Sequence, residues 1–369
     1  MHQRFPLFIG HEIYRHSTYG QRHPLAIPRV STATDLARAM GWLTDDQFVE
    51  SPRATPAQLA RFHDPAYIAA VQAAEATQTV DDATRALFDL GGVSNPIFPE
   101  VFRRPATSAG GSIHGATLIA EGGTVYNPAG GTHHGLKDRA SGFCYFNDPV
   151  LGILSLLDQG LRRVYYVDLD AHHGDGVERA FADDDRVLTV SIHETNKWPF
   201  TGAVTDRAGG MARNLPVPKG LNDSEFAAIR DRVLLPLGAA FAPDALVIQG
   251  GADAVLEDPL SRLALSNRAL WATVAALRPL APRLLLLGGG GYNPWSVGRC
   301  WAGMWGTLLG ADTTAPIPSE AEAVLRGLAW NHRFGRNPPQ AWFTTLADPP
   351  RPGPVRVEVN DVIDTVLRP

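Results

Sequence analysis

The chain contains few cysteines, few lysines and no long apolar run. Cys144 and Cys300 are the only two cysteines among 369 residues, which excludes a disulfide framework and a cysteine-type zinc site. No segment approaches the roughly 18 uncharged apolar residues of a membrane span. The apolar run 5–10 is too short for a signal-peptide core and is followed at once by His11 and Glu12. We therefore expect a soluble, cytoplasmic protein without a membrane partner.

A basic excess is also missing. The formal net charge is −5 at pH 7, and only three of the 33 basic residues are lysines. Because proteins that bind nucleic acid neutralise phosphates with a basic excess or a basic stripe, a nucleic-acid partner is excluded.

Two common motifs are absent as well. The tetraglycine 288–291 is not followed by the lysine of a phosphate loop, and His11-Glu12 is followed by His16, one residue too far for the zinc-protease spacing. The chemistry therefore has to be sought elsewhere.

The remaining pattern predicts an α/β protein. Hydrophobic residues make up 44% of the chain and charged residues 19%, which suffices for a sizeable core. Short aliphatic runs alternate with stretches of helical period, as in a parallel sheet covered by helices. The expected strands are 5–10, 124–127, 163–168, 187–192, 245–249 and 284–287, and the expected helices include 56–75, 100–120, 147–160, 222–240, 262–278 and 295–310. No repeat or linker divides the chain, so we predict one domain, 1–369, with a C-terminal extension from about residue 349.

Unusual polar residues follow four of the expected strands. They occur in the segments Gly130-Gly-Thr-His133-His134-Gly, Asp168-Leu-Asp170-Ala-His172-His173-Gly-Asp175-Gly, Gln249-Gly-Gly-Ala-Asp253 and Gly288-Gly-Gly-Gly-Tyr292-Asn. Because ligands bind beyond the carboxyl ends of parallel strands, these segments are expected to meet at one rim.

The segment 168–172 is a candidate metal site. Side chains of an extended segment alternate, so Asp168, Asp170 and His172 point to the same side. Burying them without a partner is costly, and a divalent cation is the obvious partner, since catalytic zinc takes three such ligands and keeps one position open. Asp253 offers another carboxylate. The alternatives are a solvated surface loop for 168–172 and a helix N-cap for Asp253.

His133 and His134 are candidates for proton transfer. Adjacent histidines in a loop project apart, and each needs an orienting carboxylate, for which Asp168 and Asp175 are available. A purely structural histidine pair is the alternative. The tetraglycine lets the Tyr292 hydroxyl approach a metal-bound carbonyl as an oxyanion stabiliser.

Several ordered motifs together resemble the histone deacetylase family, including its bacterial acetoin-utilisation and acetylpolyamine amidohydrolase relatives. They are His133-His134 with Ala140-Ser-Gly-Phe-Cys-Tyr-Phe-Asn-Asp148, Tyr166-Val-Asp-Leu-Asp-Ala-His-His-Gly-Asp-Gly-Val-Glu178, Gln249-Gly-Gly-Ala-Asp253 and Gly288-Gly-Gly-Gly-Tyr292. The resemblance is strongest from about residue 90 to 305. It implies the arginase/deacetylase-like three-layer α/β fold with a central, mostly parallel sheet of eight strands, and hydrolysis of N-acyl amides with one zinc ion.

The resemblance also implies a role for each site residue. Zinc would be held by three side chains, Asp170, His172 and Asp253. His134 paired with Asp175 would be the general base and acid, and His133 paired with Asp168 would stay charged. Tyr292 would donate a hydrogen bond to the substrate carbonyl.

Substrate and cation sites are implied in the same way. The implied substrate-binding residues are Gly142, Phe143, Gly290 and an aromatic wall from either Trp198 or Phe200, and a structural K⁺ or Na⁺ would be bound by Asp168, Asp170 and Ser191. The family's aspartate at the tunnel mouth, two residues before a proline, is replaced by Ser94.

The leading hypothesis is a zinc amidohydrolase that removes acetyl or other acyl groups from lysine-like amines in proteins or peptides. Fe²⁺ suits the same ligands. The alternatives are a deacetylase of acetylpolyamines or other small amines, a non-catalytic acyl-lysine binding module, and a dinuclear manganese ureohydrolase of the same fold. The sequence leaves the oligomeric state open.

Overall fold

The structure is a computed structural model that describes residues 5–20 and 22–368. One eight-stranded sheet lies at its centre, in the order β2-β1-β3-β8-β7-β4-β5-β6, and every strand pair is parallel. The strands are β1 (Leu7–Gly10), β2 (Phe48–Glu50), β3 (Gly123–Asn127), β4 (Val164–Asp168), β5 (Val187–Glu194), β6 (Ala212–Val217), β7 (Ala245–Gln249) and β8 (Arg283–Leu287).

All six strands expected from the sequence are present, and the two that were not expected, β2 and β6, are the edges of the sheet. Edge strands are only partly buried, so they lack a continuous apolar run. β2 is three residues long and β6 contains Pro216, which a central strand would not tolerate. We expected a mostly parallel sheet, and every strand pair in it is parallel.

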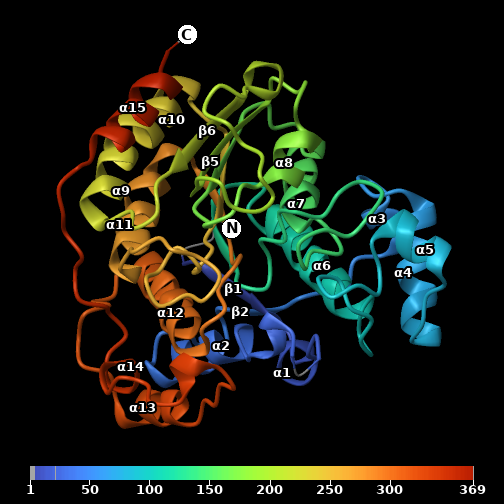
Figure 1. Ribbon diagram of the computed structural model, residues 1–369, viewed down its shortest axis with the longest axis horizontal. Coiled ribbons are helices and arrows are strands. Elements are labelled where there is room, and N and C mark those ends of the chain that lie inside the picture. The colour runs from blue at the N-terminus through green and yellow to red at the C-terminus, as the bar shows by residue number, and fades with distance from the viewer. Residues whose placement is uncertain (1–4, 21, 369) are drawn as a thin grey trace.

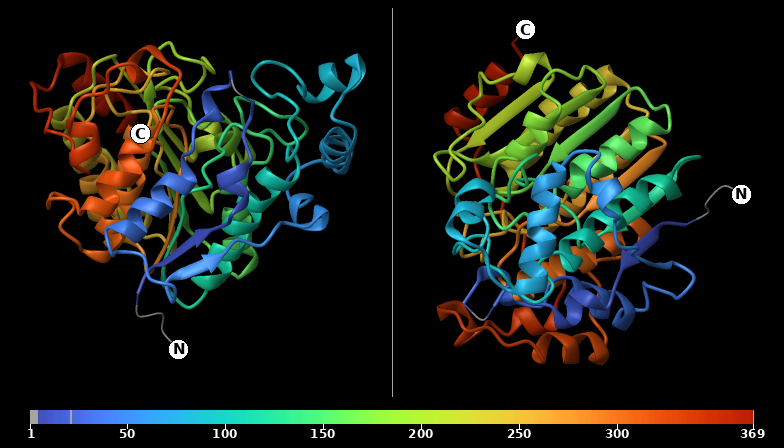
Figure 2. Two further views of the ribbon diagram at one scale, coloured as in Figure 1. Left: turned by 90° about the horizontal axis from the view of Figure 1, so that it is seen from below. Right: turned by 90° about the vertical axis from the view of Figure 1, so that its right-hand side faces the viewer.

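The sheet is covered on both faces, which gives three layers (Figures 1 and 2). Successive side chains of β4 alternate between two cores: Tyr165 and Val167 belong to one, and Val164 and Tyr166 to the other. Both sets are apolar because both faces of a parallel sheet are buried under helices.

Helical structure is present within all six expected ranges, three of which are interrupted or shortened, and further helices lie outside them. They are α1 (Ile13–His16), α2 (Val30–Ala39), α3 (Pro56–Leu59), α4 (Pro65–Thr77), α5 (Asp82–Phe88), α6 (Arg103–Leu118), α7 (Asp148–Asp158), α8 (Asp175–Ala180), α9 (Asp223–Ile229), α10 (Leu235–Phe241), α11 (Asn267–Leu277), α12 (Pro294–Leu309), α13 (Ser319–Arg326), α14 (Ala341–Thr344) and α15 (Val357–Val366). The expected helix 56–75 is wrong as one element, because Pro65 disfavours helical backbone at Asp64 and starts a new helix.

Helices α6, α7 and α8 cover one face of the sheet, and α2, α9, α11 and α12 lie on the other (Figure 1). A π-helical turn, Arg230–Leu234, joins α9 to α10, and α11 begins at Asn267 rather than at 262. Among the described residues, no helix has both the length and the apolar content that crossing a membrane requires.

The C-terminal segment returns to the body of the molecule. Residues 350–356 have no regular structure, and α15 then buries Val359, Ile363 and Val366 against the core beside β6. The Arg356 guanidinium contacts the fully buried Glu225 carboxylate at 2.5 Å. The division into one domain with an extension from about residue 349 stays a prediction.

Candidate active site

Four loops that are distant in sequence meet at one edge of the sheet. They follow β3, β8, β7 and β4, which are consecutive neighbours in the sheet. Since these strands are parallel, their carboxyl ends all point to this edge. The motif segments at 130–135, 168–176, 249–253 and 288–292 are thereby placed together.

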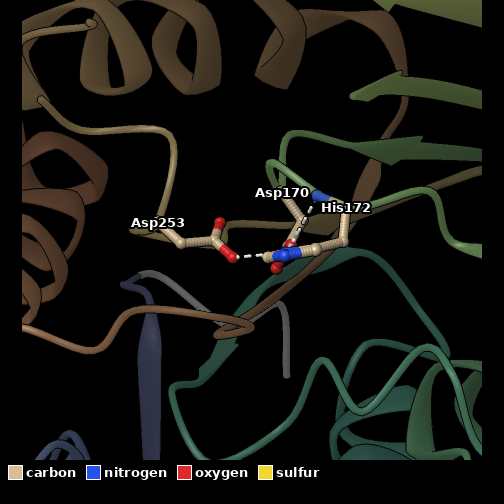
Figure 3. Close-up of side chains that lie close together, drawn as sticks. All are labelled: Asp170, His172 and Asp253. Carbon is tan, nitrogen blue, oxygen red and sulfur yellow. Dashed lines mark hydrogen bonds and ion pairs between the residues drawn. The ribbon is translucent and has the colours of Figure 1, made fainter. Parts of the chain in front are cut away.

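Asp170, His172 and Asp253 form a buried cluster that could hold a metal ion (Figure 3). One ligand atom from each lies within 4.8 Å of the others. The His172 Nδ1 atom is 2.9 Å from an Asp253 oxygen and 3.2 Å from an Asp170 oxygen. Two carboxylates and one imidazole in a buried site suit a divalent cation with three protein ligands and an open position.

The electrostatics of the cluster agree with that fit. Burial alone would lower the pKa of His172, but the Asp170 and Asp253 carboxylates raise it to about 10. The site therefore attracts positive charge. The backbone N–H of Gly290 and the side-chain amide of Gln249 both donate to Asp170 at 2.7 Å and fix the direction of its carboxylate.

Two glycines leave room for this cluster. A Cβ atom on Gly251 would lie 2.3 Å from an Asp170 oxygen, and one on Gly290 would lie 2.2 Å from an Asp253 oxygen. Gly290, a predicted substrate-binding residue, therefore supports two of the candidate metal ligands. Its carbonyl is also engaged, since it accepts from the Ala252 N–H at 2.8 Å.

His133 and His134 lie beside the cluster, each paired with a different carboxylate. The Nδ1 atom of His133 is 2.7 Å from Asp168, and that of His134 is 2.8 Å from Asp175. Asp168 also accepts from the Tyr166 hydroxyl at 2.7 Å. The pairs that the resemblance implied are therefore in contact.

The two histidines differ in charge although their ring centroids are 3.9 Å apart. Burial lowers the pKa of His134, and the neighbouring charge of His133 lowers it further, to about 3. Burial also disfavours the charged form of His133, but Asp168 and Asp170 outweigh it and raise its pKa to about 9. His133 is therefore protonated and His134 neutral at pH 7.

Tyr292 is buried and held through its backbone. Its N–H donates to Asp258 at 2.7 Å, and its ring lies 5.9 Å from that of Phe143. Burial, followed by the charges of Asp253 and Asp170, raises the pKa of Tyr292 well above its ordinary value. The hydroxyl therefore keeps its proton and can donate it in a hydrogen bond.

The sequence left open whether Trp198 or Phe200 forms the aromatic wall, and the structure places the two rings differently. The Trp198 ring is 4.6 Å from His134 and 6.5 Å from His172. A Cβ on Gly142 would lie 2.2 Å from the Trp198 ring, so the indole packs directly on this glycine. Phe200 is 75% exposed. The aromatic contact with the site comes from Trp198.

The residues predicted for a monovalent cation are adjacent, and their polar side-chain atoms already have hydrogen-bond partners. Ser191 pairs in register with Asp168 across β4 and β5, and its hydroxyl lies 3.0 Å from His193. One Asp168 oxygen accepts from the N–H of Asp170 at 3.2 Å. This site stays a prediction.

Three residues that the sequence reasoning did not assign also contribute. Gln249 orients Asp170, Asp258 holds the backbone of Tyr292, and Arg29 donates to the Gly289 carbonyl at 2.6 Å beside a small cavity under the site. Gln249 is the first residue of the motif 249–253 and Asp258 lies five residues beyond that motif, so the sequence could have pointed to both. Arg29 lies far from every motif, so only the fold brings it here.

Fold and site together define an α/β protein whose parallel sheet carries a candidate cation site and two carboxylate-paired histidines. The profile of the histone deacetylase domain matches residues 23–308. The chain belongs to the histone deacetylase family.

Similar proteins come from animals and plants. The chain is 37% identical to putative histone deacetylase 2 of Caenorhabditis elegans, covering 84% of this chain and 63% of that protein, and 38% identical to histone deacetylase 1 of Oryza sativa subsp. japonica, covering 81% and 59%. It therefore spans about 60% of the length of these curated relatives.

Solved structures of the family match the whole architecture. An HDAC homologue from Aquifex aeolicus and an HDAC homologue complexed with SAHA each superpose with a TM-score of 0.93 at 34% identity. Each match covers 98% of this chain and 100% of the other. The arginase/deacetylase-like fold expected from the resemblance is confirmed.

Proposed function

We propose that the protein is a zinc-dependent hydrolase that removes acetyl or other acyl groups from lysine-like amines. One observation carries the proposal: the buried cluster Asp170, His172 and Asp253 lies beside two carboxylate-paired histidines, of which His133 is charged and His134 neutral. A binding module has no use for that proton-transfer pair, which argues against a non-catalytic role.

A bound zinc ion would activate water and polarise the acyl carbonyl. Fe²⁺ is the other metal that suits these ligands. His134, neutral and held by Asp175, accepts the proton of the attacking water and then protonates the leaving amine. His133 stays charged and stabilises the negative charge that develops on the carbonyl oxygen. Tyr292 donates its hydroxyl to the same oxygen.

The aromatic residues support an acylated alkylamine as substrate. Phe143 contacts Tyr292, and Trp198 contacts His134, so aromatic surface leads to the proton-transfer pair from two loops. An aliphatic side chain such as that of lysine gains about 0.8 kcal/mol for each methylene buried against such surface.

The neighbouring His173 argues against a dinuclear ureohydrolase. Its Nδ1 atom is 2.8 Å from the Thr201 hydroxyl, and its Nε2 atom is 3.3 Å from Glu178. Both ring nitrogens therefore have partners outside the Asp170, His172 and Asp253 cluster.

The test is a hydrolysis assay with the purified protein on acetyl-lysine peptides, longer acyl-lysines and acetylpolyamines. We expect release of the free amine, loss of activity on chelation and recovery with one equivalent of zinc. His134→Ala should keep its metal and lose turnover. Urea release from a guanidino substrate with two equivalents of manganese would overturn the proposal.

A further inference from the structure

A large groove adjoins the candidate active site at Tyr292 and Leu260. Its volume is about 1110 Å³, and its walls come from residues 22–27, from Pro259 and Leu260, and from the segment that follows α13. This exceeds the usual range for a small-ligand pocket. The groove is therefore large enough for a chain of several residues that enters beside the site.

The groove has an aromatic floor. Trp295, Trp330 and Phe343 line it, and the Trp295 ring lies 6.4 Å from Trp330 and 6.0 Å from Phe343. His332 stacks on Trp330 at 4.3 Å. Trp295 itself is buried, so the apolar surface against which an extended peptide can pack comes from Trp330 and Phe343.

The charges of the groove have one sign. Arg22 and Arg326 line it, and no aspartate or glutamate does so within the described part of the chain. Arg333 and Arg336 lie in the same segment, and neither has an ion-pair partner among residues 5–20 and 22–368. Arg326 forms an ion pair with Glu322 at 2.6 Å. In a chain of net charge −5, the charged side chains that line this groove among the described residues are thus the two arginines Arg22 and Arg326.

The histidines of the groove add no charge at neutral pH. Burial lowers the pKa of His23 to about 4, and it also lowers that of His332. The arginines therefore supply the charge, which persists across the whole neutral range.

We propose that this groove binds an acidic peptide segment flanking the acylated lysine, so that the protein prefers acyl-lysines with aspartate or glutamate nearby. The proposal rests on the proposed hydrolase function. The arginines would bind the flanking carboxylates, and the aromatic floor would pack against the chain. The same charges repel cationic substrates, which disfavours acetylpolyamines.

This arrangement also gives peptide substrates an anchor at a place other than Ser94. Ser94 is exposed, and its carbonyl lies 3.2 Å from His23 Nε2. His23 in turn lines the groove. Anchoring by side-chain charge in the groove therefore starts next to the position where the family's aspartate is missing.

The experiment compares three sets of acetyl-lysine peptides, each varied separately before and after the lysine. The first set carries two Asp or Glu residues on the varied side, the second carries the isosteric Asn or Gln residues, and the third carries Lys residues. Exposed ion pairs contribute up to about 1 kcal/mol each, so we expect kcat/KM to be roughly three- to tenfold higher for the acidic set on at least one side, mainly through KM. This ratio should fall as salt rises. Anisotropy of the labelled peptides measures binding without turnover.

Three variants sharpen the test. Arg22→Gln with Arg326→Gln should bring the ratio of acidic to neutral peptides to about one. Glu322→Gln frees Arg326 and should raise the ratio. The matched control is Arg61→Gln, since Arg61 is 53% exposed and paired with Asp158 but does not line the groove.

Equal kcat/KM and equal binding for the acidic and neutral sets in an active protein would overturn the inference, as would a preference for acetylpolyamines. Failure to hydrolyse any acyl amine with zinc bound would instead overturn the proposed function. The two failures are therefore distinguishable.

Discussion

His133 and His134 are neighbours in the chain and in space, yet they hold different charges. The difference comes from their partners: His133 lies between two carboxylates, Asp168 and Asp170, whereas His134 has Asp175 alone and also faces the charge of His133. A single dipeptide thus holds one neutral and one charged imidazole at pH 7.

Tyr292 is expected to act on the transition state only. In Tyr292→Phe the candidate metal ligands are untouched, so metal content should be unchanged, while kcat falls by about 10² to 10³, the range for losing one oxyanion donor. Steady-state kinetics and metal analysis of the same sample check this. Wild-type kcat in the variant would remove Tyr292 from the mechanism.

Trp198 and Phe200 form a matched pair for testing the aromatic wall. Trp198→Ala removes the ring 4.6 Å from His134 and should lower kcat/KM for an acetyl-lysine peptide about tenfold, since about 1–2 kcal/mol of methylene burial is lost. Phe200→Ala removes a ring that is 75% exposed and should change kcat/KM less than about twofold. The reverse order of effects would assign the wall to Phe200.

A variant at Ser94 tests the effect of the aspartate that the family has at the tunnel mouth. An aspartate there would accept charge-assisted hydrogen bonds from substrate backbone amides, about twice as strong as neutral ones. Ser94→Asp should therefore lower KM for neutral peptides and leave a minimal acyl-lysine without those amides unchanged. If neither KM changes, another residue such as Glu100 anchors the backbone.

At the scale of elements, α15 begins at an ion pair with a buried carboxylate. Arg356, at the N-terminus of α15, contacts Glu225, which is fully buried in the first turn of α9 and also accepts from the Asn222 N–H. Burial disfavours the Glu225 carboxylate, but the hydrogen bonds from Arg356 and Asn222 outweigh it and lower its pKa.

Arg356→Gln should destabilise the fold at pH 7, because a buried carboxylate loses its charged partner. We expect about 2–4 kcal/mol, within the effect of breaking a buried pair after allowing for the partial exposure of Arg356. Since the pKa of Glu225 lies below the ordinary 4.5 in the folded protein, its contribution is present above that value and is lost as the pH falls through the folded pKa.

The difference between wild type and Arg356→Gln should therefore shrink as the pH falls below 4.5 and through the lowered pKa of Glu225. Urea unfolding at pH 7 and pH 3.5 measures it, with Arg232→Gln, which loses an exposed pair with Asp364, as the control. An equal difference at both pH values would assign the effect to packing of the arginine stem.

At the scale of the whole molecule, the candidate metal site connects loops from the middle of the sheet. Asp170 follows β4, Asp253 follows β7, and Gly290 after β8 donates to Asp170. A cation held there binds the folded state only, so it stabilises the fold by mass action, by about 2.7 kcal/mol at a hundredfold excess over Kd.

We expect one equivalent of zinc per chain and a fall in Tm of several degrees on chelation, reversed by added zinc. Elemental analysis and differential scanning fluorimetry measure the two quantities. Asp253→Asn should bind zinc weakly and show no response to the chelator. A chelator-independent Tm in a zinc-loaded wild type would contradict the link between the site and the fold.

The sequence alone determined much of this protein. The central strands were predictable because strands buried on both faces need unbroken apolar runs, and the site residues because polar groups at the ends of such runs are costly without a function. The edge strands β2 and β6 were missed, since partial burial leaves no such pattern. The break before Pro65 was missed because the apolar periodicity of 56–75 was given more weight than the proline.

Other properties required the fold. That His133 is charged and His134 neutral depends on carboxylates 35 and 41 residues away. That Trp198 rather than Phe200 contacts His134 depends on which ring the loop turns inward. The arginine groove joins residue 22 to residue 326, and Arg29 meets Gly289 across 260 residues. Charge and contact at such separations depend on distance in space, which no local pattern of residues encodes.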